Sequence, residues 1–295
     1  MTIALDEIIA GREAGGHGQQ AHHRFVVTVF GLYGRPCGRF LPVSGVVRLL
    51  TELGYEGASV RSSISRLKKR GVLVSGKIHG ANAYAMAPEL EDHMRIGDER
   101  ILAPRTASVG DPWLLASYSV PESERSNRHK IRAGLARLGF GTVASGLSIA
   151  PIRLQAEAEE YMDKHGLSDY IEFFVSSPAG GSDLRDKVAR WWDLDELERL
   201  YGEFLTTYSP ELDRLPGRSA PTAAVLGAAF RTYVPMITQW RRLPYQDPGL
   251  PPELLPDNWI GTTARRVFSE LNRVLAPLAK RHALQVLTDD PRGRT

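Results

Sequence analysis

The sequence predicts a multidomain α+β protein. We expect an amino-terminal winged helix-turn-helix, a central ferredoxin-like βαββαβ domain and a carboxy-terminal all-α domain. Three observations predict this class. Residues 22–95 contain a basic helix pair and a glycine-tipped hairpin, residues 110–178 alternate between strand and helix patterns, and residues 183–290 show only helical patterns. The length of 295 residues also favours more than one domain.

Composition and charge narrow the class of protein. Lys and Arg number 37 against 34 Asp and Glu, and this net charge of +3 excludes a polyanionic mimic and a uniformly basic, histone-like protein. The single cysteine, Cys37, excludes a disulfide scaffold and a zinc ribbon and fits a reducing cytosol. We therefore expect a cytoplasmic protein without a metal or a cofactor.

No segment is predicted to cross a membrane or to direct export. The longest apolar-rich runs, Phe25–Gly34 and Ala220–Phe230, are about half of the ~20 residues that a membrane helix needs. The first residues carry Asp6 and Glu7 and lack the basic region of a signal peptide. Residues 1–21 are rich in glycine and polar side chains near their end and are expected to form a flexible tail.

Two short helices joined by a tight turn are predicted after the apolar run that ends at residue 33. Ser44 can cap the first helix, which Gly54 ends. The second helix begins near Ser59 and is closed by Gly71. Two helices with this spacing are typical of a helix-turn-helix.

The second helix is predicted to present a basic face. Val60, Ile64 and Leu67 fall at i, i+4 and i+7 and mark its buried side. From Gly57 to Pro88 there is no Asp or Glu, and such a local excess of positive charge attracts phosphate. Arg and Ser can also reach base edges in a major groove. We therefore predict a double-stranded DNA interface made of Ser59, Arg61, Ser62, Ser65, Arg66, Lys68, Lys69, Arg70, Lys77, His79 and Asn82.

A hairpin is predicted directly after the basic helix. Val72–Val74 and Ala83–Met86 alternate like strands, and Gly76 and Gly80 mark turns between them. A solvated charged helix packed on a hairpin is the alternative interpretation, because charge runs are commonly only that. The helix pair, the basic face, the missing acids and the hairpin occur together, and this combination favours DNA binding by a winged helix.

The central domain follows a polar linker at residues 96–112 that contains Pro and Gly. Strands are predicted at Trp113–Val120, Phe140–Val143, Leu147–Ile149 and Tyr170–Ser176, and helices from Pro121 to Gly139 and over Gln155–His165. The order βαββαβ is ferredoxin-like, and antiparallel sheets of this size often pair across a two-fold axis, which predicts a homodimer. The first helix of this domain carries a cluster of basic side chains. It forms either a solvated face or an auxiliary contact to phosphate or another anion. Its members are Arg125, Arg128, His129, Lys130 and Arg132.

The carboxy-terminal segment is predicted to be helical. Residues 183–213 are rich in acid and form one or two amphipathic helices, and Thr222–Trp240 is an apolar helix. Pro244–Pro256 is expected to be a proline-stiffened connector and not a helix, and Thr262–Leu287 a long helix.

Three stretches resemble the PaaX family, the phenylacetate-degradation repressors. The run VRSSISRLKKRGVL followed by AYAMAPE is similar to the family's amino-terminal winged helix. The run DPWLLASYSVPESERSNRHKIRAGLARLGFGTVASGLSIAP is similar to its central segment, and WRRLPYQDPGLPPELLPDNWIGTTARRVF to its carboxy-terminal segment. The resemblance extends in order from about Arg24 to His282. It implies a homodimeric repressor of a catabolic operon, released by an aryl-coenzyme A thioester such as phenylacetyl-CoA.

An effector of that kind needs cations for its phosphates and an aromatic pocket for its aryl group. In the carboxy-terminal segment the candidates are Trp192, Arg231, Tyr233, Trp240 and Arg241. Each of them can equally belong to the core or to the ordinary surface.

The sequence offers little support for an enzyme or for a protein–protein adaptor. The carboxy-terminal segment contains no HExxH, GxSxG or GxGxxG motif. The spacing of its residues also suggests no pair of nucleophile and base, so an enzyme is not expected. A metal-dependent nuclease built on the central domain would need clustered carboxylates, and only Asp111 lies near the first strand. A winged-helix protein–protein adaptor would fit the fold but would leave the acid-free basic stretch unexplained.

Overall fold

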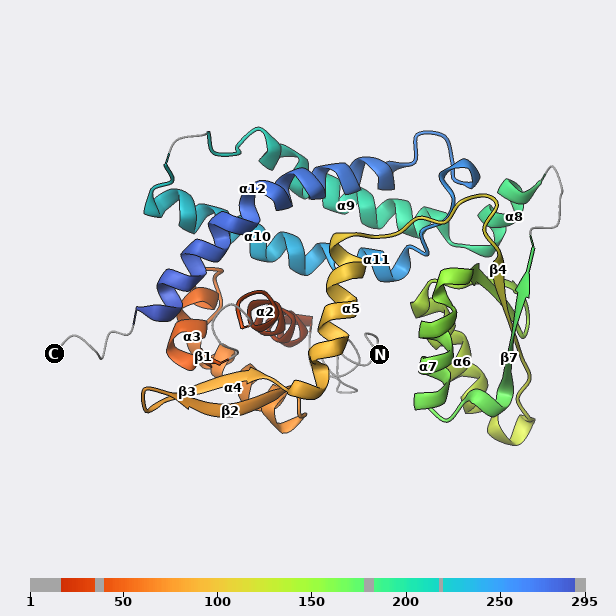
Figure 1. Cartoon of the computed structure of the whole chain (residues 1–295), viewed down its shortest axis with the longest axis horizontal. Helices are drawn as coiled ribbons and strands as arrows, with labels where there is room; N and C mark the ends of the chain where they lie inside the picture. The colour runs from red at the N-terminus through yellow and green to blue at the C-terminus, as the bar shows by residue number, and fades with distance from the viewer. Residues whose placement is uncertain (1–16, 35–39, 178–182, 218–219, 290–295) are drawn as a thin grey trace. The chain divides into compact units, whose positions relative to one another are not determined.

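The computed structural model describes residues 17–34, 40–177, 183–217 and 220–289 (Figure 1). It is a mixed α+β structure with two small sheets and a helical carboxyl-terminal part, as the sequence predicts. Its contacts divide the chain into two units. Among the described residues, the amino-terminal unit contains 17–34, 40–97, 208–217, 220–240 and 267–289, and the central unit contains 98–177, 183–207 and 241–266. The carboxyl-terminal helices are thus divided between the two units.

The amino-terminal unit holds a three-stranded sheet and the helices around it. Its elements are α2 (His17–Tyr33), β1 (Leu41–Pro42), α3 (Val43–Thr51), α4 (Gly57–Lys69), β2 (Leu73–Ile78), β3 (Ala81–Met86), α10 (Ala223–Trp240) and most of α12 (Ile260–Thr288). The strand order is β1-β3-β2, with antiparallel neighbours. Its core contains Phe30, Tyr33 and Phe230, and the ring of Trp240 stacks on Phe268 with the centroids 4.3 Å apart.

Helix α2 begins earlier than the sequence suggests. The predicted tail reaches residue 21, but α2 begins at His17. The polar residues at its start contain no proline, so they continue the helix of the buried apolar run that follows. Residues 1–16 of the predicted tail and Cys37 lie outside the described residues.

The central unit contains a four-stranded antiparallel sheet. Its elements are β4 (Trp113–Tyr118), α6 (Arg125–Leu138), β5 (Gly141–Ala144), β6 (Leu147–Pro151), α7 (Gln155–Lys164) and β7 (Ile171–Ser176), in the order predicted from the sequence. The strand order in the sheet is β5-β6-β4-β7. Helix α6 ends at Gly139, where a φ of +97° requires the left-handed conformation that glycine adopts without strain.

Two predicted irregular segments contain helix. α5 (Glu91–Leu102) continues into the expected linker at residues 96–112, and there Arg100 is fixed by the carbonyl oxygens of Leu138 and Pro244 and by the carboxylate of Glu157. The expected connector after residue 243 begins with the single turn α11 (Leu243–Gln246). Its proline occupies the first turn, where the missing N–H costs no hydrogen bond.

The remaining helices are α8 (Leu184–Trp191) and α9 (Leu194–Leu212). Short 3-10 turns lie at Pro88–Leu90, Glu122–Glu124, Ile152–Leu154, Ser168–Tyr170 and Pro252–Leu254. Across the described ranges, no helix is both long and apolar enough to cross a membrane.

Candidate nucleic-acid interface

Helices α3 and α4 pack closely because a small residue lies where they meet. A Cβ on Gly57, the first residue of α4, would lie 3.2 Å from the side chain of Val47 in α3. The turn between the helices contains Gly54 with a φ of +88°. The predicted buried face of α4 is confirmed, since Val60, Ile64 and Leu67 are almost inaccessible to solvent.

The predicted contact residues of α4 lie on its outer side. Arg61, Ser62, Ser65, Lys68 and Lys69 are exposed, and Ser59, Arg66 and Arg70 are half-buried. The ammonium group of Lys68 lies over the ring of Tyr84 in β3, 5.9 Å from its centroid, which is within cation–π range. The helix and the hairpin therefore contribute to one surface.

Strands β2 and β3 form the predicted hairpin. Its two-residue turn is His79–Gly80, and both residues have positive φ, 48° and 81°, as a type I′ turn requires. Lys77 is paired with Asn82, one pair away from the turn, and both side chains and that of His79 are exposed.

The prediction that Gly76 marks a turn is wrong, because this residue lies inside β2. Glycine is required there for a different reason. A Cβ at this position would lie 2.3 Å from the ring of Phe40, so the aromatic ring packs directly on the backbone of the strand.

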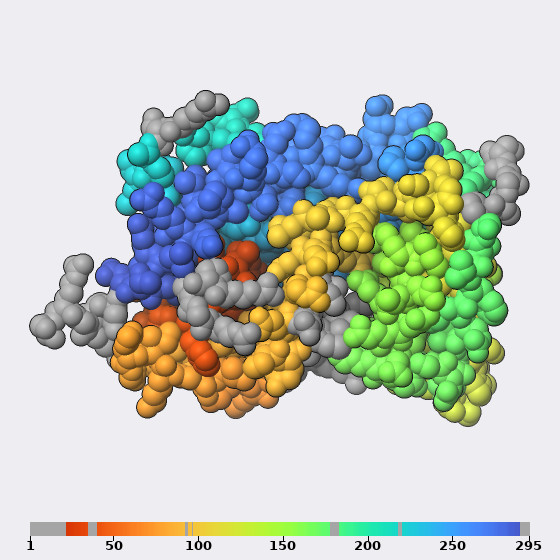
Figure 2. Space-filling view, viewed as in Figure 1, coloured from red at the N-terminus to blue at the C-terminus, as the bar shows by residue number. Residues whose placement is uncertain are grey.

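The surface of α4 and the hairpin is positive because its sequence contains no carboxylate from Gly57 to Pro88. Six Lys and Arg side chains fall in this range. Figure 2 shows the hairpin segment in orange at the surface of the molecule. The net charge of this segment is therefore strongly positive, whereas the net charge of the whole chain is near neutral.

The carboxyl-terminal end of α12 holds α3 in place from the side (Figure 1). The Arg48 guanidinium donates to the main-chain oxygens of Val286 and, at 2.6 Å, of Asp289. At the carboxyl-terminal cap of α3, a Glu52 carboxylate oxygen lies 2.7 Å from Nε2 of His282. The guanidinium of Arg48 is thus a cation at the carboxyl end of α12, a position that the helix dipole favours.

The same side of α3 carries Gly45, where a Cβ would lie 2.9 Å from the side chain of Leu287. Gly45, Arg48 and Glu52 fall at i, i+3 and i+7 and so share one face of the helix. Sequence reasoning missed this contact. The spacing was visible in the sequence, but its partner lies more than 200 residues away.

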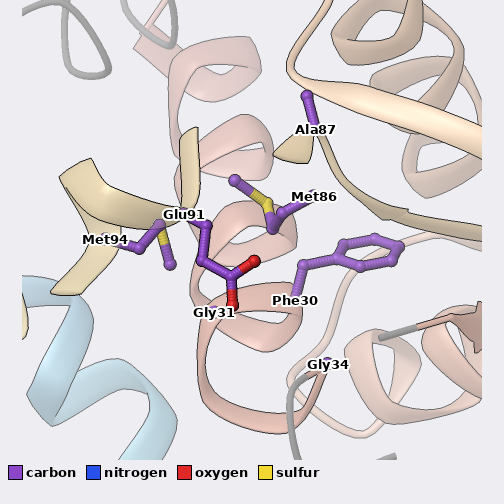
Figure 3. Close-up of a pocket in the computed structure, with 7 residues that line it drawn as sticks. All are labelled: Phe30, Gly31, Gly34, Met86, Ala87, Glu91 and Met94. Atoms are coloured by element: carbon purple, nitrogen blue, oxygen red, sulfur yellow. The ribbon is translucent and has the colours of Figure 1, made fainter. Parts of the chain in front are cut away.

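A small pocket lies beside the hairpin, between α2, the end of β3 and α5 (Figure 3). Phe30, Met86, Glu91 and Met94 contribute side chains to its walls. Its volume of about 30 Å³ has room for roughly two water molecules. An acyl-CoA molecule does not fit this pocket.

The five predicted effector residues do not fall in one unit. Trp192 belongs to the central unit, where its Nε1 donates to the main-chain oxygen of Gly139 at 2.8 Å, and Arg241 belongs to the same unit. Arg231, Tyr233 and Trp240 belong to the amino-terminal unit. Trp192, Tyr233 and Trp240 are buried, Arg231 is exposed, and Arg241 is half-buried.

Sequence reasoning also missed an ion pair in the central unit between a buried carboxylate and a half-buried guanidinium. Asp247 is 7% exposed and accepts hydrogen bonds from the Tyr201 hydroxyl at 2.6 Å, from Arg265 at 2.5 Å and from the N–H of Gly249 at 2.7 Å. Burial and the nearby carboxylate raise the pKa of Tyr201 well above its usual value, so the phenol stays protonated and remains a donor.

Asp111, the carboxylate considered for a nuclease, has a local structural partner. It accepts a hydrogen bond from the N–H of Ser108 at 2.8 Å, within the turn before β4. In the part of the chain that the structure describes, no three His, Cys, Asp or Glu side chains gather in a set that could hold a metal.

Comparison with known proteins agrees with the order of the segments. A family model described as PaaX-like protein matches residues 22–90, one described as PaaX protein central Cas2-like domain matches 106–188, and one described as PaaX-like protein C-terminal domain matches 192–285. The chain belongs to the PaaX family. The resemblance seen in the sequence is thereby confirmed, and the helix pair and hairpin lie within the first match.

Two individual proteins are similar over most of their length. The transcriptional repressor PaaX of Escherichia coli (strain K12) is 26% identical over 240 residues, which cover 80% of this chain and 75% of that protein. The solved structure of the uncharacterized protein Rv0674 from Mycobacterium tuberculosis has a TM-score of 0.55 and 18% identity. The match covers 88% of this PaaX-family chain and 97% of the Rv0674 chain, and it indicates a shared fold.

Proposed function

We propose that this PaaX-family protein is a DNA-binding transcriptional repressor, a regulator and not an enzyme. The observation that carries the proposal is the acid-free surface of α4 and the hairpin, with its exposed Lys, Arg and Ser side chains. Similarity to a transcriptional repressor over most of the chain supports it. Because its target is DNA, such a repressor would act in the cytoplasm.

In this proposal α3, α4 and the hairpin act as a winged helix-turn-helix. A major groove of about 12 Å admits one helix. The outer side of α4 would enter it, with Arg61, Ser62, Ser65 and Arg66 toward base edges. The DNA backbone would be contacted by Ser59, Lys68, Lys69 and Arg70 of α4 and by Lys77, His79 and Asn82 of the wing.

Two copies would bind a near-palindromic operator, with half-sites one helical turn or a multiple of it apart. The central domain would join them; its strand order β5-β6-β4-β7 supports the proposal that it is ferredoxin-like. An acyl-CoA effector, by family resemblance an aryl-CoA such as phenylacetyl-CoA, would bind the form that does not bind DNA and release a catabolic operon. Trp192, Arg231, Tyr233, Trp240 and Arg241 remain the candidate effector contacts.

A gel shift with DNA from upstream of the gene tests the proposal. Each phosphate contact contributes about 0.9 to the slope of log K against log salt. Lys69→Ala should therefore flatten the slope by about one unit on every DNA sequence, which is about a threefold smaller loss of affinity between 50 and 200 mM salt. Arg66→Ala should weaken operator binding more than binding to unrelated DNA. Lys280→Ala removes an exposed lysine of α12 and is the matched control.

The outcomes separate the parts of the proposal. If Lys69→Ala and Lys280→Ala have equal slopes and Arg66→Ala binds the operator normally, the assignment of α4 as the DNA-reading helix is wrong. A specific shift that no acyl-CoA thioester releases would keep the DNA-binding function and overturn the effector.

A further inference from the structure

Helix α6 of the central unit exposes a row of basic side chains along one flank. Arg125, Arg128, His129 and Arg132 fall at i, i+3, i+4 and i+7, which places them on one face of the helix. All four side chains are exposed, and α6 itself contains no Asp or Glu. These four residues are called the cationic stripe below.

The cationic stripe points away from the neighbouring helix. Helices α6 and α7 lie side by side on one face of the central sheet (Figure 1). They touch at Gly134, because a Cβ on this residue would overlap the ring of Tyr161 in α7. With 3.6 residues per turn, the stripe lies roughly 120–180° around α6 from Gly134. It therefore faces solvent and not the side of α7.

The acids that precede α6 do not neutralise the stripe. The carboxylate of Glu124 accepts a hydrogen bond from the Asn127 amide at 3.2 Å and another from the Tyr170 hydroxyl. Asn127 lies seven residues before Gly134 and so on the same side of the helix, which holds Glu124 away from the stripe. Glu122 is the other acid of this turn, and the three arginines of the stripe outnumber it.

The stripe residues also have donors to spare. Arg125, His129 and Arg132 form no hydrogen bond, ion pair or ring contact within the described ranges. Arg128 donates to the main-chain oxygen of Val120 at 2.8 Å, which uses one of the five N–H groups of its guanidinium. Each of the four side chains can therefore bind an acceptor from outside the chain.

The charges of the two helices are separated by sign. Helix α7 exposes Glu159, Glu160 and Asp163, whereas α6 exposes the cationic stripe. The surface of an ordinary domain has charges of both signs interspersed. Cations gathered on one flank instead concentrate a positive potential that attracts an anionic partner.

A phosphate backbone suits the stripe better than a protein or a lipid surface. No large apolar side chain is exposed on α6. Protein interfaces have an apolar core, and a helix that lies on a membrane buries an apolar face, but contacts to DNA phosphates are polar throughout. At 1.5 Å per residue the stripe is about 10 Å long, which is the length of about three phosphates along one DNA strand.

We propose that the cationic stripe is a second contact of this protein with double-stranded DNA, made to the phosphates and independent of base sequence. The inference rests on the proposed function, because it assigns a further contact to the same DNA partner. Phosphate contacts position a protein without reading bases. The stripe thus adds affinity and salt dependence, and the sequence preference stays with α4.

Salt dependence tests the stripe in the full chain. Arg125→Ala combined with Arg132→Ala removes two phosphate contacts and should flatten the slope of log K against log salt by about 1.8. The loss of affinity between 50 and 200 mM salt then becomes about 12-fold smaller, on the operator and on unrelated DNA alike. Lys164→Ala combined with Arg190→Ala removes two exposed cations from α7 and α8 and should leave the slope unchanged. Far-ultraviolet circular dichroism confirms that both variants are folded.

Cross-linking locates the contact. Ala136 is exposed one turn beyond Arg132 on the line of the stripe, and Ala156 is exposed on the acidic helix α7. In the full chain carrying Cys37→Ser, Ala136→Cys and Ala156→Cys are each coupled to a photoactivatable aryl azide. The probe on Ala136→Cys should cross-link to the upstream DNA, and the probe on Ala156→Cys should not.

Equal slopes for the two double variants, or equal cross-linking from both cysteine positions, would overturn the inference. If Lys69→Ala still flattened the slope in that case, the DNA-binding function of α4 would stand without the stripe. A flatter slope in the stripe variant with none in Lys69→Ala would keep the stripe and refute the assignment of α4. A chain that binds neither the operator nor unrelated DNA would overturn both.

Discussion

Replacing Arg48 by alanine removes the side chain that joins α3, the first helix of the proposed DNA-reading pair, to the end of α12. Its guanidinium donates to two main-chain oxygens, those of Val286 and Asp289. A hydrogen bond from a charged donor contributes about 1.5–3 kcal/mol, and a cation at a helix carboxyl end about 0.3–1 kcal/mol. Because the bond to Asp289 is exposed, we expect a total loss of about 2–3 kcal/mol.

Thermal unfolding measures this loss. A cooperative unit of this size loses roughly 3 °C of Tm per kcal/mol, so Arg48→Ala should lower the transition of the amino-terminal unit by roughly 6–9 °C. Amide hydrogen exchange should also accelerate in the last turn of α12, where two carbonyl groups lose their partner. Arg48→Lys keeps the charge but not the planar fork and should recover part of the loss.

The control is Arg281→Ala, an exposed arginine on the same helix. It should change the free energy of unfolding by less than about 0.5 kcal/mol. Equal Tm values for Arg48→Ala and Arg281→Ala would refute the reasoning, because they would mean that the contacts of Arg48 with α12 contribute nothing to stability.

Three further substitutions test the packing around the candidate sites. Asp247→Ala leaves Arg265 without its carboxylate and should cost about 3–5 kcal/mol in calorimetry. Gly76→Val inserts a side chain where the Phe40 ring lies and should cost about 1–3 kcal/mol in urea unfolding. Trp192→Phe keeps an aromatic ring but removes the indole N–H, which leaves a buried carbonyl without its donor, and should cost about 1–3 kcal/mol with a changed near-ultraviolet spectrum.

Matched substitutions show what would contradict these values. Glu253→Ala removes an exposed carboxylate from the central unit, and Gly202→Ala adds a Cβ that meets no atom within 4 Å. If Asp247→Ala cost no more than Glu253→Ala, the buried pair would not stabilise the fold. If Gly76→Val were as mild as Gly202→Ala, the close contact with Phe40 would not constrain β2.

Local pattern was sufficient for the four strands of the central sheet, for α6 and α7 beside them, and for α4. Val60, Ile64 and Leu67 repeat with the helical period, and their burial follows from that repeat. Gly139 ends α6 where the sequence predicts an end, because only glycine adopts the required φ without strain. The exposed basic residues of α4 could be assigned for the same reason, since a helix that buries one stripe must expose the other.

Local pattern failed where a distant partner decided the conformation. The helix of α5 continues through the expected linker because Arg100 finds partners on three other segments. Gly76 looked like a turn residue because composition does not show that an aromatic ring needs the space. The effector residues stay a prediction; among them, Trp192 and Trp240 also have buried partners that residue type alone does not show.

The sequence by itself determined the family, the α+β class, the helix pair with its hairpin and the acid-free basic surface. These depend on periodicity, on glycine at required turns and on charge, which are properties of short segments. Only the tertiary structure decided which segments meet: α3 with the end of α12, Asp247 with Arg265, and β7 at the open edge of its sheet. Such contacts join residues far apart in the chain, and their stability comes from burial and pairing that exist only after folding.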